Sequence, residues 1–288
     1  MAANSEKNKI ESHTLYLVAT PIGNLADITE RAKKTLGEVD FVAAEDTRNS
    51  YKLLSCYGIE NELVSYHEHN KASSGEKIVA RLLSGESCAL ITDAGMPAIS
   101  DPGEDLVRLC QESGIKVKIV PGASAAVSAL ALSGLSTKRF AFEGFLSANK
   151  GERKKRLEKV KGEERTLIFY EAPHKLKATL KDMAEIFGGE RRITLCKELT
   201  KINEAAVKTT LREAVLYYEE NEPKGEFVLV VEGAPESDGT DNELNSLSLE
   251  EHLEHYMKTG LTKKDAIKAI AKDRGLSKSE VYAAFTND

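Results

Sequence analysis

Five short apolar segments, each followed by a turn and then by a helical pattern, constrain the fold more than any other feature of this sequence. They occupy the first half of the chain at Thr14–Ala19, Val39–Ala44, Leu63–Tyr66, Cys88–Thr92 and Val117–Val120. Short continuous apolar runs bounded by turn residues are typical of strands that are buried on both faces. Because these strands alternate with helices, the sequence predicts a parallel, doubly wound α/β sheet, to which we assign residues 13–137.

A second α/β domain is predicted for residues 138–234, where strand and helix signals alternate less strictly. Its apolar segments are Phe140–Phe145, Thr166–Tyr170, Ile193–Lys197 and Gly225–Glu232. The looser alternation favours a mixed sheet over a purely parallel one.

Three further segments flank these domains. Residues 1–12 are polar and are predicted to form a loose tail, whereas residues 235–246 are acidic and rich in turn residues, as expected of a linker. Residues 247–288 contain three short helical patterns, and Ser277–Glu280 matches a capping box at the start of the third. This layout is typical of a small helix-turn-helix unit, which binds nucleic acid or docks onto other proteins.

Composition narrows the class of protein. With 41% hydrophobic and 30% charged residues the chain is typical of soluble globular proteins, and no apolar run approaches the roughly 18 residues of a membrane span. Four scattered cysteines without a Cys-x-x-Cys pair indicate a reducing, cytoplasmic location and no zinc site. The net charge of −6 does not favour general nucleic-acid binding, so any polyanion would have to bind to a local basic patch. The densest basic stretch of the sequence is Lys150–Lys161.

The loop that follows the Cys88–Thr92 strand is the strongest candidate for a ligand site. Asp93 and Asp101 bracket it, and its glycines allow the backbone to approach a ligand closely. Loops between a strand and a helix usually contain about 2–6 residues, so the greater length favours a binding loop over a simple connection. Open α/β sheets bind ligands at the carboxyl ends of their strands, where this loop must lie.

The other strands deliver polar loops to the same edge. Thr20–Asn24 contains one glycine instead of the G-x-G-x-x-G fingerprint, which disfavours a classical dinucleotide site. Glu45–Arg48 is explained equally well as a functional site and as a helix cap. His67–Asn70 lacks a visible third metal ligand, so we favour substrate contact there over metal binding. The small residues after Pro121–Ser124 indicate either a ligand at a helix N-terminus or close helix–sheet packing.

Several short motifs occur together and in a fixed order. One set comprises Ala19–Asn24, Ala44–Arg48, Asp93–Pro97, Ser100–Gly103 and Pro121–Ser124. A second set comprises Tyr66–Asn70, Glu143–Phe145, Phe169–Pro173, Glu198–Lys201 and Lys224–Glu226. The first set resembles the tetrapyrrole methylase superfamily, and the second resembles its ribosomal RNA small-subunit methyltransferase I branch. The resemblance covers the chain from Leu15 to about Glu232.

The resemblance implies two α/β domains that bind S-adenosylmethionine in the cleft between them, usually in a homodimer. It also implies 2′-O-methylation of a cytidine ribose in small-subunit (16S) ribosomal RNA. The loops expected to hold the cofactor contribute Pro21, Ile22, Gly23, Asp93, Ala94, Gly95, Pro97, Ser100, Asp101, Pro121, Ser124, Tyr170, Glu171 and Ala172. Methyl transfer from a sulfonium depends mainly on alignment of the reacting atoms, so we expect no metal and no protein nucleophile.

A ribose hydroxyl is a poor nucleophile while it is protonated, so a general base is expected at the sheet edge. The candidates are Glu45, Asp46 and His67, and Glu45 is preferred because Asp46 is the better helix-capping residue. Candidates for contacts with RNA phosphates are basic side chains at this edge and in the densest basic stretch, namely Arg48, Arg153, Lys154 and Lys155.

Two alternative functions are compatible with the sequence. In one, the same fold methylates a small porphyrinoid, although such a substrate needs neither the basic stretch nor the helical unit. In the other, the helix-turn-helix unit is the functional end of a nucleic-acid-binding regulator, and the α/β part senses a ligand.

Overall fold

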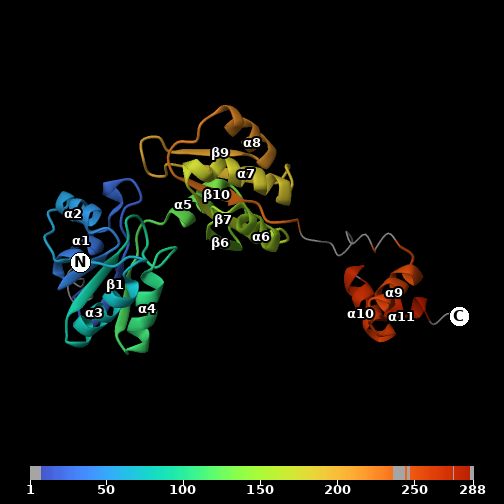
Figure 1. The fold of residues 1–288 in the computed structure, drawn as a ribbon, viewed down its shortest axis with the longest axis horizontal. Coiled ribbons are helices and arrows are strands. Elements are labelled where there is room, and N and C mark those ends of the chain that lie inside the picture. Colours follow the sequence, from blue (N-terminus) through green and yellow to red (C-terminus); the bar gives the residue numbers. More distant parts are fainter. Residues whose placement is uncertain (1–7, 236–243, 245–246, 275, 286–288) are drawn as a thin grey trace, which may run out of the picture. The chain divides into compact units, whose positions relative to one another are not determined.

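The structure is a computed structural model that describes residues 8–235, 244, 247–274 and 276–285. The chain divides into two compact units, Met1–Glu232 and Gly233–Asp288, the second of which is coloured red in Figure 1. Most of the predicted tail (1–12) and most of the predicted linker (235–246) lie outside the described residues. The larger unit contains two five-stranded sheets.

The first sheet is entirely parallel, as predicted from the alternation of strands and helices. Its strands, in spatial order, are β3 (Leu63–Ser65), β2 (Phe41–Ala44), β4 (Ser87–Ile91), β1 (Thr14–Val18) and β5 (Lys116–Val120). Because β4 lies at the centre, the long loop after it emerges in the middle of the carboxyl edge, where open α/β sheets bind their ligands.

Helices cover both faces of this sheet. α1 (Glu30–Glu38) and α2 (Thr47–Cys56) pack on one face, and α3 (Lys71–Leu83) and α4 (Gly103–Glu112) pack on the other. Successive residues of a strand point to opposite faces, and those of β1 alternate accordingly between the two cores. The predicted doubly wound arrangement is confirmed.

The second sheet is mixed, as predicted. Its strands, in spatial order, are β6 (Phe140–Phe145), β7 (Thr166–Glu171), β10 (Phe227–Val231), β8 (Arg192–Lys197) and β9 (Ala205–Thr210). The β6–β7 pair is parallel, and the other described pairs are antiparallel. The sequence does not predict β9, because this strand lies at the sheet edge, all six of its residues are exposed or half-buried, and its apolar residues are limited to Ala205, Ala206 and Val207.

Helices also cover both faces of the second sheet. α6 (Lys150–Val160), α7 (Pro173–Phe187) and α8 (Leu211–Glu220) share one core with the strands. The other face is covered by α5 (Ala125–Ser133), which follows β5 in sequence yet shares a core with β7, β8 and β10 (Figure 1). Close helix–sheet packing, one of the two explanations offered for its small residues, is observed. The other stays a prediction, because Ser124 and Ala125 at the start of α5 line the cavity described below.

The smaller unit consists of α9 (Leu249–Lys258), α10 (Lys263–Asp273) and α11 (Lys278–Ala284). These helices share an apolar core that includes Ile267, Ile270, Ala271 and Val281. The capping box predicted at Ser277–Glu280 is present at the start of α11. No helix among the described residues combines the length and the apolar character needed to cross a membrane.

Candidate functional site

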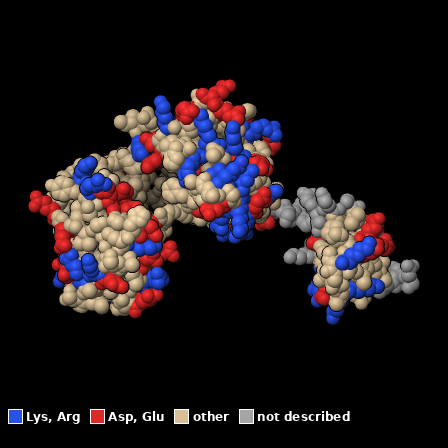
Figure 2. Space-filling view, in the orientation of Figure 1, with Lys and Arg blue, Asp and Glu red and all other residues tan. Residues whose placement is uncertain are grey.

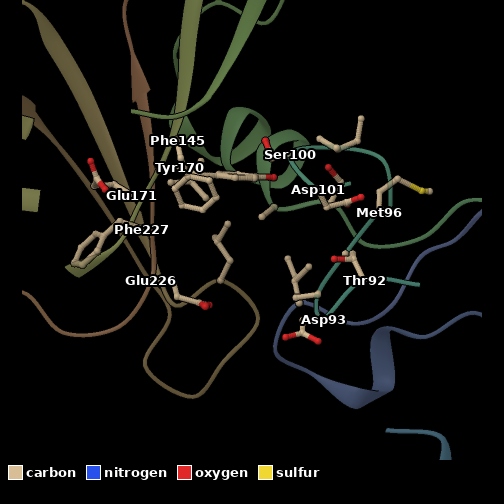
Figure 3. A pocket seen from close by; sticks show the side chains of 18 of the residues that line it. Thr92, Asp93, Met96, Ser100, Asp101, Phe145, Tyr170, Glu171, Glu226 and Phe227 are labelled. Atoms are coloured by element: carbon tan, nitrogen blue, oxygen red, sulfur yellow. The ribbon is translucent and has the colours of Figure 1, made fainter. Parts of the chain in front are cut away.

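A cavity of about 510 Å³ lies between the carboxyl edge of the first sheet and the end of the second sheet. Figure 3 shows Met96, Ser100 and Asp101 on one side of it and Phe145 and Tyr170 on the other. Most of the residues predicted to bind a cofactor line this cavity: Ile22, Asp93, Ala94, Gly95, Ser100, Asp101, Ser124, Tyr170, Glu171 and Ala172. Pro21, Gly23, Pro97 and Pro121 lie in the same loops but do not line it.

The long loop after β4 is held in an unusual backbone conformation. Gly95, Ala98 and Ser100 have positive φ angles of 84°, 67° and 65°, and such a conformation is strained for the two residues that carry a Cβ atom. Asp101 stabilises the loop, because its Oδ1 accepts hydrogen bonds from the backbone N–H groups of Ala98 (2.9 Å) and Gly103 (2.7 Å).

The second carboxylate oxygen of Asp101 is the most informative atom of the cavity wall. Oδ2 is buried, and no described residue donates a hydrogen bond to it. A buried acceptor without a donor is costly in free energy, so buried polar atoms are nearly always paired. A ligand that carries an ammonium or hydroxyl group would supply the missing donor.

The loops at the cavity are also joined to one another. Thr20 and Gly95 exchange two backbone hydrogen bonds of 2.9 and 3.2 Å. Gly23 lies so close to the loop after β8 that an added Cβ atom would stand 2.5 Å from Cγ of Lys201 and 3.0 Å from the carbonyl oxygen of Leu199. Although Gly23 does not line the cavity, it therefore allows the two α/β domains to approach each other at its margin.

In the Glu45–Arg48 segment, Asp46 caps a helix and Glu45 lines the cavity, which is the arrangement preferred from the sequence. Asp46 is the N-cap of α2, and Arg48 and the backbone N–H groups of the helix bond its carboxylate and lower its pKa to about 2. Glu45 instead lines the cavity, where Thr92 Oγ1 donates a 3.0 Å hydrogen bond to its Oε2. Asp46 is therefore occupied as a cap, and Glu45 remains the candidate base.

His67, the third candidate base, does not line the cavity. Its backbone N–H donates to Asn70 Oδ1 at 2.8 Å, and its Nδ1 is buried without a hydrogen-bond partner among the described residues. Its ring lies 5.9 Å from that of His69. This arrangement offers no direct route from His67 to a substrate hydroxyl in the cavity.

The opposite wall is built on the ends of β6 and β7. The hydroxyl of Tyr170 accepts a 3.2 Å hydrogen bond from the N–H of Ala126, and burial raises the pKa of that hydroxyl. Glu171 is buried, and its carboxylate is bonded to Thr179 Oγ1 (2.5 Å) and paired with Lys175 Nζ (3.1 Å). Glu171 therefore shapes the wall and is already satisfied within the protein.

The predicted phosphate contacts differ in their availability. The structure contradicts the predicted phosphate contact of Arg153, because only 5% of the residue's surface is exposed and its guanidinium pairs with Asp182 at 2.7 Å. Lys154 pairs with Glu185 at 2.6 Å, whereas Lys155 is exposed and forms no ion pair with a described residue. Lys and Arg side chains gather over this part of the larger unit in Figure 2.

Sequence reasoning did not name several residues of the cavity wall. Met96 and Ile99 belong to the loop from Asp93 to Asp101 that was predicted to bind the ligand, whereas the others lie outside the predicted loops: Thr92, Phe145, Cys196, Leu199, Glu226, Phe227 and Val228. A signal existed for some of them, because Thr92, Phe145 and Phe227 lie at ends of predicted strands that face the cleft. None existed for Cys196 or Val228, whose side chains line the cavity from within strands of the second sheet.

Comparison with known proteins gives a consistent result. Residues 14–215 match the family model described as Tetrapyrrole (Corrin/Porphyrin) Methylases. A protein of Halalkalibacterium halodurans called ribosomal RNA small subunit methyltransferase I is 50% identical over 282 residues, which cover 98% of this chain and 97% of that protein. A protein of the same name from Bacillus subtilis is 50% identical over 283 residues, with the same coverage.

Solved structures add a comparison of the fold alone. The uroporphyrin-III-C-methyltransferase of Thermus thermophilus has a TM-score of 0.55 and 20% sequence identity. The match covers 76% of this chain and 94% of that protein. At this sequence identity the match shows the fold alone and says nothing about the substrate.

Proposed function

Because this chain belongs to the tetrapyrrole methylase family, we propose that it transfers a methyl group from S-adenosylmethionine to small-subunit ribosomal RNA. One observation carries the proposal: relatives named for this activity are 50% identical to the chain over 98% of its length. We further propose that the acceptor is the 2′-hydroxyl of a cytidine ribose, as the resemblance of the branch motifs implies.

The residues around the cavity fit this cofactor. A cavity of about 510 Å³ is within the roughly 300–1,000 Å³ of small-molecule sites. Ile22 and Met96 give it apolar surface, and Asp101 Oδ2 offers an unused acceptor for an ammonium or hydroxyl group. We assign cofactor binding to these residues together with the loop from Asp93 to Ser100.

Glu45 is the residue that we assign to proton removal. When bound, S-adenosylmethionine supplies a methyl group activated by a sulfonium centre. Glu45 lines the same cavity, and the hydrogen bond from Thr92 fixes its Oε2 while Oε1 carries no hydrogen bond from a described residue. A carboxylate oriented in this way can accept the proton of a ribose hydroxyl as the hydroxyl oxygen attacks.

Exposed lysines of α6 are the cations that we assign to the RNA backbone. Lys150, Lys155 and Lys159 are exposed and form no ion pair with any residue that the structure describes. Phosphate binding by such side chains is largely independent of sequence and weakens as salt rises. Because these lysines do not distinguish one nucleotide from another, we assign recognition of the target nucleotide to the residues of the cavity. Arg48 is also exposed, although it is paired with Asp46.

We also propose that the protein acts as a homodimer in the cytoplasm, where it meets the ribosomal subunit. The support is the resemblance to a superfamily whose members usually form homodimers. Sedimentation of the purified chain tests this point, and a monomer at micromolar concentration contradicts it.

The central experiment uses purified protein, S-adenosylmethionine with a labelled methyl group, and small ribosomal subunits from cells that lack the gene. We expect calorimetry to detect binding of S-adenosylmethionine, and nucleoside mass spectrometry to find one 2′-O-methylcytidine. No binding of the cofactor or its demethylated product, with or without RNA, refutes the proposal. Methylation of a porphyrinoid but not of RNA supports the alternative substrate class.

A further inference from the structure

We infer that Phe145 is a stacking platform for a nucleobase of the RNA substrate and thereby positions the ribose at the cavity. The inference rests on the proposed function, because it requires an RNA substrate. Proteins that recognise unpaired RNA commonly stack its bases on aromatic side chains. Enzymes that modify nucleotides must first remove the target from its neighbours, and stacking in the new position offsets that cost.

Exposure distinguishes Phe145 from the other aromatic residues of the cavity wall. Phe145 is 58% exposed, whereas Phe227 is 2% exposed and Tyr170 is half-buried with its hydroxyl bonded. A phenylalanine ring at the mouth of a ligand cavity presents a large apolar face to water. Among the described aromatic residues of this cavity, it is the one with free surface for a ligand that enters from solvent.

The backbone places the ring there by a specific local distortion. The pairing of β6 with β7 shifts register between Phe142 and Gly144, and Gly144 has a positive φ of 65°. In a regular strand Phe142 and Phe145 would point to opposite faces, since side chains alternate. Here both rings contact Tyr170, with centroids 5.0 and 5.4 Å from its ring. Bulges of this kind re-aim side chains beside functional sites.

The ring of Phe145 is also held in place. Its contact with Tyr170 is edge-on, with an interplanar angle of 60°. The ammonium of Lys175 lies 5.6 Å from its centroid, and that ammonium is fixed by the carbonyl oxygen of Leu146 (3.1 Å) and the carboxylate of Glu171 (3.1 Å). A stacking surface that is ordered before binding loses less entropy when the base arrives.

The position of Phe145 links the two parts of the proposed RNA site. The residue lines the cavity at the end of β6, and α6 with its exposed lysines begins at Lys150, after a connection of only four residues. Gly144, the residue before Phe145, packs closely against the loop after β4, because a Cβ atom added at Gly144 would lie 3.1 Å from Ser100 Oγ. An RNA strand whose phosphates meet α6 would therefore bring a base to Phe145 beside the cavity.

Four variants of the full chain test the inference: Phe145→Ala, Phe145→Leu, Phe145→Trp and the control Tyr217→Ala. Tyr217 is likewise 58% exposed, but it lies on α8 and does not line the cavity. We expect kcat/KM for small subunits from cells lacking the gene to fall roughly 5- to 150-fold for Ala and Leu, the effect of losing one base–aromatic stack. The Trp variant and the control should remain within about threefold of the parent by the same reasoning.

Binding of S-adenosylmethionine and the oligomeric state are measured in parallel, and both should stay unchanged in every variant. Loss of cofactor affinity in Phe145→Ala would show that the ring contacts the cofactor and would overturn the inference, as would a change of oligomeric state. Full activity of Phe145→Leu would overturn it too, because leucine fills space without stacking. Failure of the proposed function itself would be distinguishable, since the parent protein would then not methylate RNA.

Discussion

Removing the carboxylate of Asp182 should destabilise the second α/β domain severely. Asp182 Oδ2 accepts hydrogen bonds from Arg153 Nε and Nη2 at 2.8 and 2.7 Å, and both side chains are only 6% exposed. Arg153 Nη1 also donates to the carbonyl oxygens of Ser147 and Ala148, so the pair fixes the segment between β6 and α6 to α7. In Asp182→Ala the guanidinium would remain buried without its counter-charge, which costs about 3–5 kcal/mol.

The assay is urea unfolding of the full chain followed by far-UV circular dichroism, since the chain contains no tryptophan. Lys181→Ala is the matched control, because its 3.0 Å pair with Glu219 is about half exposed and such pairs contribute roughly 0–1 kcal/mol. Replacing both partners, as in Arg153→Met with Asp182→Leu, should cost much less than Asp182→Ala alone. A loss below about 1 kcal/mol in Asp182→Ala would refute the reasoning and would return Arg153 to the candidate RNA contacts.

Three further predictions concern the cavity and the helical unit. Glu45→Gln should lower the single-turnover methylation rate roughly 10²- to 10⁴-fold without changing cofactor affinity, and a near-normal rate would mean that no base resides there. His252 is buried in α9 and burial lowers its pKa, so its NMR titration midpoint should lie below about 6.5 and the thermal stability of the helical unit should fall as the pH drops below that value. Gly23→Ala should weaken cofactor binding, as measured by calorimetry, because the new methyl group would clash with Lys201. The control Gly162→Ala should leave the affinity unchanged, because nothing lies within 4 Å of the added carbon. Equal affinities of the two variants would contradict this account.

The three inner strands of the first sheet, β1, β2 and β4, were predictable because burial on both faces leaves a simple trace in the sequence. Each of the five strands of this sheet overlaps a predicted apolar run, with ends that differ by one or two residues: β4 begins at Ser87 and β5 at Lys116, each one residue earlier than predicted, and β2 begins at Phe41, two residues later. β9 left no such trace, since it is held at the sheet edge by backbone hydrogen bonds to β8 and all of its side chains are exposed or half-buried. Side-chain preferences for strands change with the position of a strand in its sheet, so residue patterns predict an exposed edge strand poorly.

The candidate site, like the sheets, could be predicted from the sequence only in part. The loops at the carboxyl edge follow from strand direction, and the capping preferences of Glu45 and Asp46 correctly separated the residue that lines the cavity from the helix cap. The basic stretch did not reveal that Arg153 is buried, because its partner Asp182 lies on another helix 29 residues later. Likewise, chain order does not reveal that α5 packs against the sheet that follows it.

The reciprocal hydrogen bonds between Thr20 and Gly95 have a consequence for hydrogen exchange. Each residue donates its N–H to the carbonyl oxygen of the other, so separation of the two backbone segments breaks both hydrogen bonds together. Local opening of such a segment is cooperative, and both amides should exchange through the same opening event. A ligand that contacts only the loop after β4 would then slow exchange at Thr20 by the same factor as at Gly95.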